Sequence, residues 1–282
     1  MNQTGGKAPE LRRLSVTIVI PTLNAAKHFV QCAKSIRRQS RPADEVIVVD
    51  AQSSDETTEI AKTFGFTLIS EPCNRAVART VGLAASSSEY VLMMDADQVL
   101  AESCIEELSK AAFGMPYASL ILNETTIGDD AWRRLLADED RVEFEIGEGL
   151  PRWFPRDIAM IFFSNVDVSA PHIHGEDRAI RNGLATSGYT VGRVYGAAIY
   201  HNEPEFKSFL QKQFRNAFYG TNGTLLELYV RVSWRSALRK FNPIAAYSVL
   251  RSPLRLVEYY ALLAARLTFQ VSGMILSRRS SG

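Results

Sequence analysis

The chain has 282 residues, of which 46% are hydrophobic and 22% are charged, and its net charge at pH 7 is +1. This composition excludes a chain that is disordered over much of its length, and it suits one large domain or one domain with an appendage. The three cysteines share no metal-binding spacing, so the sequence excludes a disulfide framework and a zinc site and favours a reducing, cytoplasmic compartment.

Strand and helix patterns alternate over the first 112 residues. Residues 1–14 are polar and lack an apolar signal core, so we expect a flexible tail there. Buried strands are predicted at residues 16–20, 45–49, 67–70 and 90–94. Helices are predicted at residues 24–39, 53–64, 76–85 and 102–112, with Asn24 and Ser53 as caps of the first two and Gly65 ending the second. This alternation predicts a parallel sheet covered by helices on both faces.

The remainder of the chain is less regular and ends in a helical region. Strands are predicted at residues 117–122, 161–163, 189–194 and 197–201, and helices at residues 130–146 and 176–187. Residues 151–158 (PRWFPRDI) are predicted to form a loop. From residue 206 the pattern is helical, so we expect a domain over residues 15–204 and a helical region over residues 205–282.

Polar or turn residues follow three of the predicted parallel strands. Pro21, Asp50 and Asp95 each stand at a strand's carboxyl end. Ligands of open α/β sheets bind beyond these ends. We therefore expect the functional site at this edge of the sheet.

Two acids separated by one residue, Asp95 and Asp97, close the fourth strand. Residues two apart on an extended segment point to the same side. Two carboxylates on one side suit Mg²⁺ or Mn²⁺, which prefer oxygen ligands and keep waters and substrate phosphates in their shell. The alternative interpretation is a turn that happens to contain two acids.

Neither a G-x-G-x-x-G after the first strand nor the P-loop pattern G-x-x-x-x-G-K-[ST] occurs, which disfavours a dinucleotide-binding Rossmann domain and a P-loop. Asp50 could accept hydrogen bonds from a ribose or base, or it could be an ordinary loop acid. Asn74, Arg75 and Arg79 enter a predicted helix where phosphates could be held, although arginines at such positions are more often solvated or salt-bridged.

Five segments in order carry a family resemblance: VTIVIPTLNAAKHFVQCAKSI, EVIVVDAQSSDETTEIA, NRAVARTVGLAAS, EYVLMMDADQVL and GEDRAIRNGLATSGY. They resemble the signature segments of family-2 glycosyltransferases with the GT-A fold, over about residues 15 to 220. YHNE and FLQKQFRNAFYG look like a subset that acts in cell-envelope glycan pathways. The resemblance implies a Rossmann-like mixed sheet flanked by helices. It also implies metal-dependent, inverting sugar transfer from a UDP- or GDP-sugar to a glycan or lipid-linked acceptor.

The resemblance also implies roles for particular residues. Asp97 would hold Mg²⁺ or Mn²⁺, Asp95 the ribose or the metal, and His201 would be a further metal ligand. Asp177 would be the general base toward the acceptor hydroxyl, with Glu176 supporting it. The donor-binding set is Pro21, Thr22, Asn24, Asp50, Ser53, Asn74, Arg75, Arg79, Asp95, Ala96 and Asp97.

Several of these residues also have structural interpretations. His201 could be a hydrogen-bonded histidine at a strand end, and acids such as Glu176 and Asp177 are common at helix N-termini. His172 and His174 fit a loop near the acceptor better than a metal site. Trp153 and Phe154 could stack on a sugar or form a local hydrophobic clamp.

The C-terminal region from residue 205 holds 12 Lys and Arg against 3 Asp and Glu, whereas the first 204 residues hold 20 against 28. A basic region attracts an anionic surface. Residues 254–276 are long and apolar but contain Arg255, Glu258 and Arg266, which disfavours a spanning helix. We expect either peripheral contact with the cytoplasmic face of a membrane through residues 205–282 or packing on the domain or in a homodimer, and no nucleic-acid partner.

Two other classes of function remain open for this sequence. A non-catalytic module binding sugar nucleotides or glycans would need no base, and the retained acids Asp95, Asp97 and Asp177 argue against it. A sugar nucleotidyltransferase would be expected to carry a Gly-rich phosphate loop after the first strand, which is absent.

Overall fold

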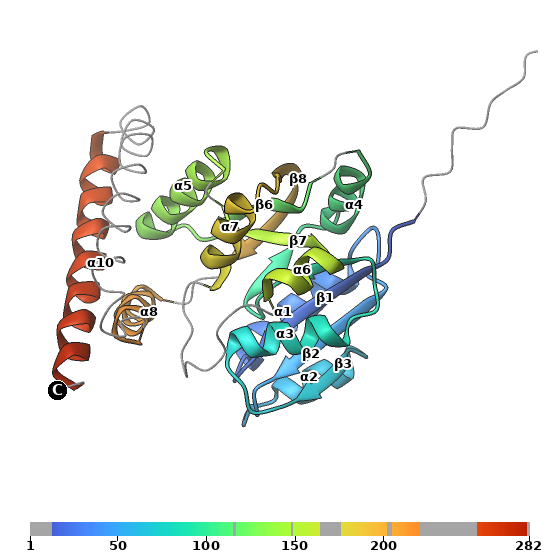
Figure 1. The fold of residues 1–282 in the computed structure, drawn as a ribbon. Helices are drawn as coiled ribbons and strands as arrows, with labels where there is room; N and C mark the ends of the chain where they lie inside the picture. The colour runs from blue at the N-terminus through green and yellow to red at the C-terminus, as the bar shows by residue number, and fades with distance from the viewer. Residues whose placement is uncertain are drawn as a thin grey trace, which may run out of the picture.

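The computed structural model describes residues 13–114, 117–147, 149–163, 176–201, 205–219 and 253–280. Within them an 8-stranded mixed sheet runs in the order β3-β2-β1-β4-β7-β6-β8-β5 (Figure 1). The strands are β1 (Val16–Thr22), β2 (Glu45–Asp50), β3 (Thr67–Ser70), β4 (Tyr90–Met93), β5 (Gln98–Leu100), β6 (Ser119–Thr126), β7 (Pro151–Pro155) and β8 (Val191–His201).

The half of the sheet formed by β3, β2, β1 and β4 is parallel, as the sequence predicts. Thr22 pairs with Asp50 and Asp50 with Ser70, so the carboxyl ends of β1, β2 and β3 lie level with one another. Val19 pairs with Met93 near the end of β4. The segment that contains Asp95 and Asp97 therefore leaves the sheet beside the end of β1.

The other half of the sheet brings distant parts of the chain to the same edge. Strand β7 runs antiparallel to both β4 and β6, while β8 runs parallel to β6. The short strand β5 pairs antiparallel with β8 and sets Gln98 opposite His201. The register of β6 with β8 shifts between Leu122 and Asn123, and beyond that shift Thr126 pairs with His201.

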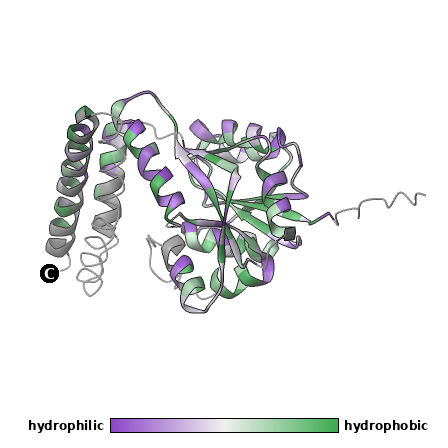
Figure 2. Cartoon of the chain, turned by 90° about the horizontal axis from the view of Figure 1, so that it is seen from above, coloured by the Kyte–Doolittle hydropathy of each residue, from purple (hydrophilic) through white to green (hydrophobic). Residues whose placement is uncertain are grey.

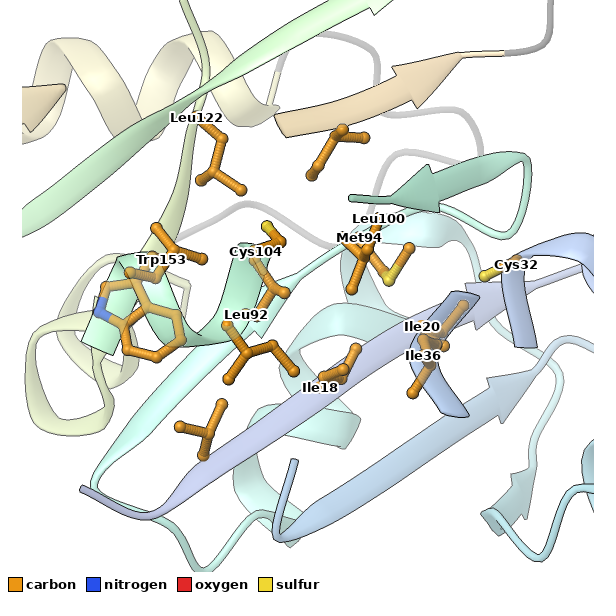
Figure 3. Packing of buried hydrophobic residues seen from close by; sticks show 14 of the residues in the cluster. Ile18, Ile20, Cys32, Ile36, Leu92, Met94, Leu100, Cys104, Leu122 and Trp153 are labelled. Carbon is orange, nitrogen blue, oxygen red and sulfur yellow. The ribbon is translucent and has the colours of Figure 1, made fainter. Parts of the chain in front are cut away.

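Helices cover both faces of the sheet. Residues of α1 (Ala26–Arg37), α2 (Thr57–Thr63) and α4 (Cys104–Gly114) share one core with Ile18, Ile20 and Trp153. Figure 3 shows part of this core, in which Cys32 and Ile36 of α1 lie near Ile20. The opposite face is covered by α3 (Arg75–Ala85), α6 (Arg156–Phe163) and α7 (Glu176–Thr186), which share a second core with Val19. The predicted layered α/β architecture is confirmed.

Helix α3 approaches the sheet unusually closely at Gly82. A Cβ atom at this position would lie 2.4 Å from Cγ1 of Val19 and 3.1 Å from Cγ2 of Val49. Only a residue without a side chain fits there. This close packing fixes α3, and with it the polar residues at the helix N-terminus, against the ends of β1 and β2.

A third cluster joins α5 (Ala131–Glu145), α8 (Phe206–Tyr219) and α10 (Pro253–Ser280). Its buried members are Leu135, Leu136, Val142, Phe209, Leu210, Tyr259 and Leu262. Helix α10, which leads to the C-terminus, lies at the end of the molecule opposite β3 in Figure 1, and the C-terminus also lies at one end of the molecule in Figure 2. Among the described helices none combines the length and the apolar character that crossing a membrane requires.

Several local predictions are wrong because tertiary packing overrides local preference. Residues 151–158 form β7 and the start of α6, since Trp153 and Phe154 are buried between β4, β6 and the core instead of forming a loop. Residues 161–163 are helical despite their β-preferring side chains, because Phe163 packs from α6 into the second core. The two short strands predicted at residues 189–194 and 197–201 are one strand, β8.

The two predicted helix caps are also wrong. Ala25 is the N-cap of α1, while Asn24 has a φ of 49° and its side-chain oxygen accepts a hydrogen bond from the backbone N–H of Ser54. Ser53 does not cap α2, because its hydroxyl donates to Asp50 Oδ1 instead. Gly65 ends α2 with a φ of 63°, as predicted.

Candidate active site

A cavity of about 590 Å³ opens where the carboxyl ends of β1 and β4 meet the half of the sheet formed by β7, β6, β8 and β5. Its walls come from the ends of β1 and β4, from β6 to β8, and from α5, α8 and α10. The predicted site residues that line it are Pro21, Asn24, Arg75, Asp95, Ala96, Asp97 and His201. The cavity therefore stands at the edge of the sheet that the sequence indicated.

Asp95 is held by two buried arginines. Arg79 of α3 donates from Nη2 to Asp95 Oδ1 at 2.8 Å, and Arg152 of β7 approaches Oδ2 with Nη1 at 3.5 Å. The Arg79 and Arg152 side chains are 0% and 3% exposed. Burial would raise the pKa of Asp95, but Arg79 and then Arg152 outweigh it and hold this pKa well below its ordinary range. Asp95 is therefore ionised, and its carboxylate is paired with Arg79 and Arg152.

Asp97 differs from Asp95 although the two are only two residues apart. Asp97 lines the same cavity, and no residue in the described part of the chain forms a hydrogen bond or ion pair with its carboxylate. Its oxygen atoms are therefore the donors that remain for a hard cation.

The described side chains fit a Mg²⁺ or Mn²⁺ ion that shares its shell with a ligand. Within the part of the chain that the structure describes, no three His, Cys, Asp or Glu side chains are arranged to hold a metal by themselves. Mg²⁺ in nucleotide sites is commonly held by one or two carboxylates, substrate phosphates and waters. A single carboxylate such as that of Asp97, open to a polar cavity, matches this mode of binding.

Glu124 of β6 links two of the other side chains at the site. Its Oε1 accepts from Arg152 Nε at 2.8 Å, and its Oε2 lies 2.7 Å from His201 Nε2. Burial raises the pKa of Glu124, but Arg152 and His201 outweigh it and lower this pKa to about 2. Glu124 is therefore ionised.

A closed ring of contacts results. Gln98 Oε1 accepts from the backbone N–H of Asp95 at 2.8 Å, and Gln98 Nε2 lies 3.2 Å from His201 Nε2. Arg152 connects Asp95 to Glu124, and Glu124 contacts His201. Gln98 then connects His201 back to Asp95. Residues from five different strands or strand ends, β4, β5, β6, β7 and β8, are thus connected at the cavity.

Asp140 of α5 adds a second unusual acid. Its Oδ2 accepts from the backbone N–H of Thr126 at 2.7 Å and from the Thr126 hydroxyl at 2.9 Å. Burial outweighs these hydrogen bonds and the attraction of His201, and it raises the pKa of Asp140 to about 7. Burial alone would lower the pKa of His201, but the hydrogen bond and charge of Glu124 leave it raised.

The other predicted donor-binding residues do not line the cavity. Asp50 is 0% exposed, and its carboxylate accepts from Thr22 Oγ1 at 2.9 Å and from the Ser53 N–H at 2.8 Å. The Asn74 side chain caps α3 by accepting from the N–H of Val77 at 3.0 Å. Thr22, Asp50, Ser53, Asn74 and Arg79 thus stabilise the loops and helix that present the cavity-lining residues, and none of them lines the cavity.

Some predicted residues fall outside the described part of the chain. Helix α7 begins at Glu176, as predicted, but the side chains of Glu176 and Asp177 are not among those described. His172 and His174 also lie outside the described residues. Trp153 and Phe154 are each 1% exposed, so of the two interpretations left open the hydrophobic clamp holds and the open sugar platform does not.

The sequence interpretation missed Glu124, Arg152 and Gln98. One signal was available, because Glu124 continues the side of the β6 strand that carries Leu120 and Leu122, where an acid needs a partner. The partner could not be identified, since Arg152 is 28 residues away and His201 is 77 residues away.

The parallel half of the sheet, with a charged cavity beyond the carboxyl ends of its strands, places the chain among the α/β proteins whose ligands bind at that edge. The model of glycosyl transferase family 2 matches residues 17–182, more than half of the chain, and this chain belongs to that family.

Solved structures of the GT-A fold resemble this chain. The match to the mannosyltransferase PcManGT from Pyrobaculum calidifontis covers 95% of this chain and 87% of the PcManGT chain, with 18% identity and a TM-score of 0.57. TarS residues 1–349 from Staphylococcus aureus cover 95% of this chain and 92% of that one, with 16% identity and a TM-score of 0.54. At these identities the likeness shows the GT-A fold alone.

A curated relative, the glycosyltransferase GlyG of Streptococcus pneumoniae, is 29% identical over 100 residues, which are 33% of this chain and 33% of GlyG. Matches to other curated glycosyltransferases likewise span about a third or less of their length.

Proposed function

We propose that this glycosyltransferase moves a sugar from a nucleoside-diphosphate donor to a hydroxyl of a glycan or lipid-linked acceptor, with a divalent cation and with inversion. The observation that carries the proposal is the Asp97 carboxylate, which lines the cavity beside the ends of β1 and β4. The solved PcManGT is a complex with GDP-Man and Mn²⁺, and the solved TarS fragment is a complex with UDP. These ligands support a nucleoside-diphosphate donor and a manganese-like cation here.

The N-terminus of α3 is suited to the diphosphate. Arg75 stands in the first turn of α3, which Asn74 caps, and the Arg75 side chain lines the cavity. Backbone N–H groups at a helix N-terminus favour anions, and a guanidinium next to them adds a matching charge. Gly82 holds this helix against β1, so Arg75 is presented from a rigid element.

Asp97 is the proposed main protein ligand of the cation, with His201 as a second ligand. When bound, Mg²⁺ or Mn²⁺ would stabilise the negative charge of the departing nucleoside diphosphate. Asp95 would contribute through the ribose or the cation while Arg79 and Arg152 hold it in place.

The acceptor side is assigned to the start of α7. Asp177 is the proposed general base, removing the proton of the acceptor hydroxyl as that oxygen attacks the anomeric carbon, and Glu176 supports it. Ile180 and Leu184 anchor α7 in the second core, which would fix the position of its first turn. One in-line displacement inverts the configuration at the anomeric carbon.

Helix α10 is the proposed contact with a membrane, near a lipid-linked acceptor. Leu254 and Val257 are 67% and 65% exposed, and the region is strongly basic. Flotation with anionic liposomes should carry the protein, and neutral liposomes should carry less. A second subunit is the alternative occupant of this surface, and light scattering without lipid would reveal it.

Release of nucleoside diphosphate from a panel of UDP- and GDP-sugars tests the enzymatic proposal. With one donor of the panel, the enzyme should release nucleoside diphosphate in the presence of Mn²⁺. This activity should be lost in EDTA and in the variant Asp97→Asn. The first-formed sugar product should have the anomeric configuration opposite to that of the donor. Undiminished turnover in EDTA, or retained configuration, would contradict the proposal.

A further inference from the structure

Two groups of opposite hydrogen-bonding character approach the same nitrogen of His201. The Glu124 carboxylate lies 2.7 Å from Nε2, and the side-chain nitrogen of Gln98 lies 3.2 Å from it. Gln98 Oε1 already accepts from the backbone of Asp95, so the group that faces His201 is the amide NH₂.

One ring nitrogen cannot serve both neighbours. A nitrogen that carries a proton can donate to Glu124 but cannot accept from Gln98. A nitrogen with a lone pair can accept from Gln98, but its lone pair is repelled by those of the carboxylate oxygen. The contact with Glu124 is 0.5 Å shorter and involves an anion, which makes it the stronger hydrogen bond. The proton therefore belongs on Nε2.

We propose that Glu124 is a positioning residue of the donor site: it fixes the proton of His201 on Nε2 and leaves Nδ1 as the ring nitrogen with the lone pair. The inference rests on the proposed function, in which His201 is a ligand of the cation. A metal-binding histidine commonly donates its other N–H to a carboxylate, which fixes the tautomer and orients the ring.

A carboxylate is required at position 124 because three donors meet there. Arg152 donates to Oε1 through Nε and to Oε2 through Nη2, at 2.8 and 3.3 Å, and His201 donates to Oε2. Glutamine has only one acceptor oxygen. If that oxygen stays with Arg152, the new NH₂ faces His201, and the imidazole proton must move to Nδ1.

The tautomer can be read directly by ¹⁵N NMR of histidine-labelled protein without ligands, at an alkaline pH where the ring is neutral. The chain has only 4 histidines, and His201→Gln would assign the ring of interest. We expect Nε2–H in the wild type, in Glu124→Asp and in the matched cavity variant Glu139→Gln. We expect Nδ1–H in Glu124→Gln. Nδ1–H in the wild type, or no change in folded Glu124→Gln, would overturn the proposal.

Calorimetry with UDP and GDP, each with and without Mn²⁺, tests the consequence for binding. Glu124→Gln should weaken Mn²⁺-dependent binding by about 10- to 100-fold, as loss of an outer partner of a metal ligand does. Glu124→Asp should retain more affinity. In a His201→Gln background the Glu124→Gln change should have no further effect.

A Glu124→Gln effect of equal size in the His201→Gln background would show that Glu124 acts through Arg152 alone, and it would overturn the proposal. If the wild type bound neither nucleotide with Mn²⁺, the proposed function would fail. The NMR result would still decide whether Glu124 sets the tautomer, so the two failures are distinguishable.

Discussion

Asp95 Oδ1 accepts a hydrogen bond at 2.8 Å from Nη2 of Arg79, a guanidinium whose side chain has no exposed surface. A buried cation requires a partner, and removal of that partner leaves an uncompensated charge. Asp97 stands two residues further on and has no such partner among the described residues. The two acids therefore have different roles. Asp95 stabilises the structure of the site, and the carboxylate of Asp97 is available to a ligand.

Asp95→Asn and Asp97→Asn should consequently fail in different ways. Asp95→Asn should reduce the free energy of unfolding by about 3–5 kcal/mol, because the buried guanidinium of Arg79 would lose the charged group that accepts from its Nη2. Asp97→Asn should unfold like the wild type but lose Mn²⁺-dependent nucleotide binding. Urea unfolding followed by circular dichroism measures the first effect, and equal stability losses in the two variants would contradict the assignment.

Gly82→Ala tests the close packing of α3 on the sheet. The added Cβ would lie 2.4 Å from Cγ1 of Val19, so the variant should lose about 1–3 kcal/mol of stability. Val19→Ala removes that methyl group and is the matched control. The double variant should be more stable than the sum of the two single losses predicts, whereas simple additivity would show that Val19 is not the obstacle.

The ion pair between Glu139 and Arg266 ties α10 to α5 at the cavity wall. Arg266 Nη1 lies 2.6 Å from Glu139 Oε2, and the guanidinium carbon lies 5.7 Å from the centre of the Phe209 ring. Arg266→Ala should speed hydrogen exchange of the α10 amides while leaving β1 unchanged, because the cation also packs on α8.

The charge-swapped double variant Glu139→Arg with Arg266→Glu is the control for this ion pair. It should restore a substantial part of the protection that either single reversal removes. Equal exchange in Arg266→Ala and the wild type would mean that the pair does not hold α10.

Asp140 predicts a pH dependence of stability. Its pKa of about 7 in the folded protein lies above its ordinary value of 3.8, with His201 and Glu143 as the charged groups that act on it and Thr126 as its hydrogen-bond donor. Between these two values the folded state binds more protons than the unfolded state, so this contribution to stability falls as pH rises.

Asp140→Asn should remove that fall, because asparagine keeps the acceptor for Thr126 and cannot ionise. At pH 8 the variant should melt roughly 2–4 °C above the wild type for each kcal/mol recovered, and the difference should disappear near pH 4. Scanning calorimetry at the two pH values measures this. A variant that melts lower at pH 8 would show that the Asp140 carboxylate is stabilising when ionised.

The parallel half of the sheet was predictable because its strands are continuous apolar runs and its helices follow at regular spacing. Asp95 and Asp97 could be found for the same reason, since they end such a run. Their different environments could not be predicted, because Arg152 approaches Asp95 from a strand 57 residues away. Long-range pairing of this kind leaves no local pattern.

The half of the sheet formed by β7, β6, β8 and β5 was difficult to predict for the same reason. The segment PRWFP reads as a loop, but it is a buried strand because β4 and β6 lie on either side of it. Glu124 lies just beyond the strand predicted at residues 117–122, and only the neighbouring Arg152 and His201 give it a role.

Anomalous diffraction from crystals grown with Mn²⁺ and a bound nucleoside diphosphate tests the central claim most directly. The account predicts one manganese peak within coordination distance of the Asp97 carboxylate and of the diphosphate oxygens, inside the cavity at the ends of β1 and β4. Clear density for the nucleotide there, with no manganese peak next to Asp97, would contradict it.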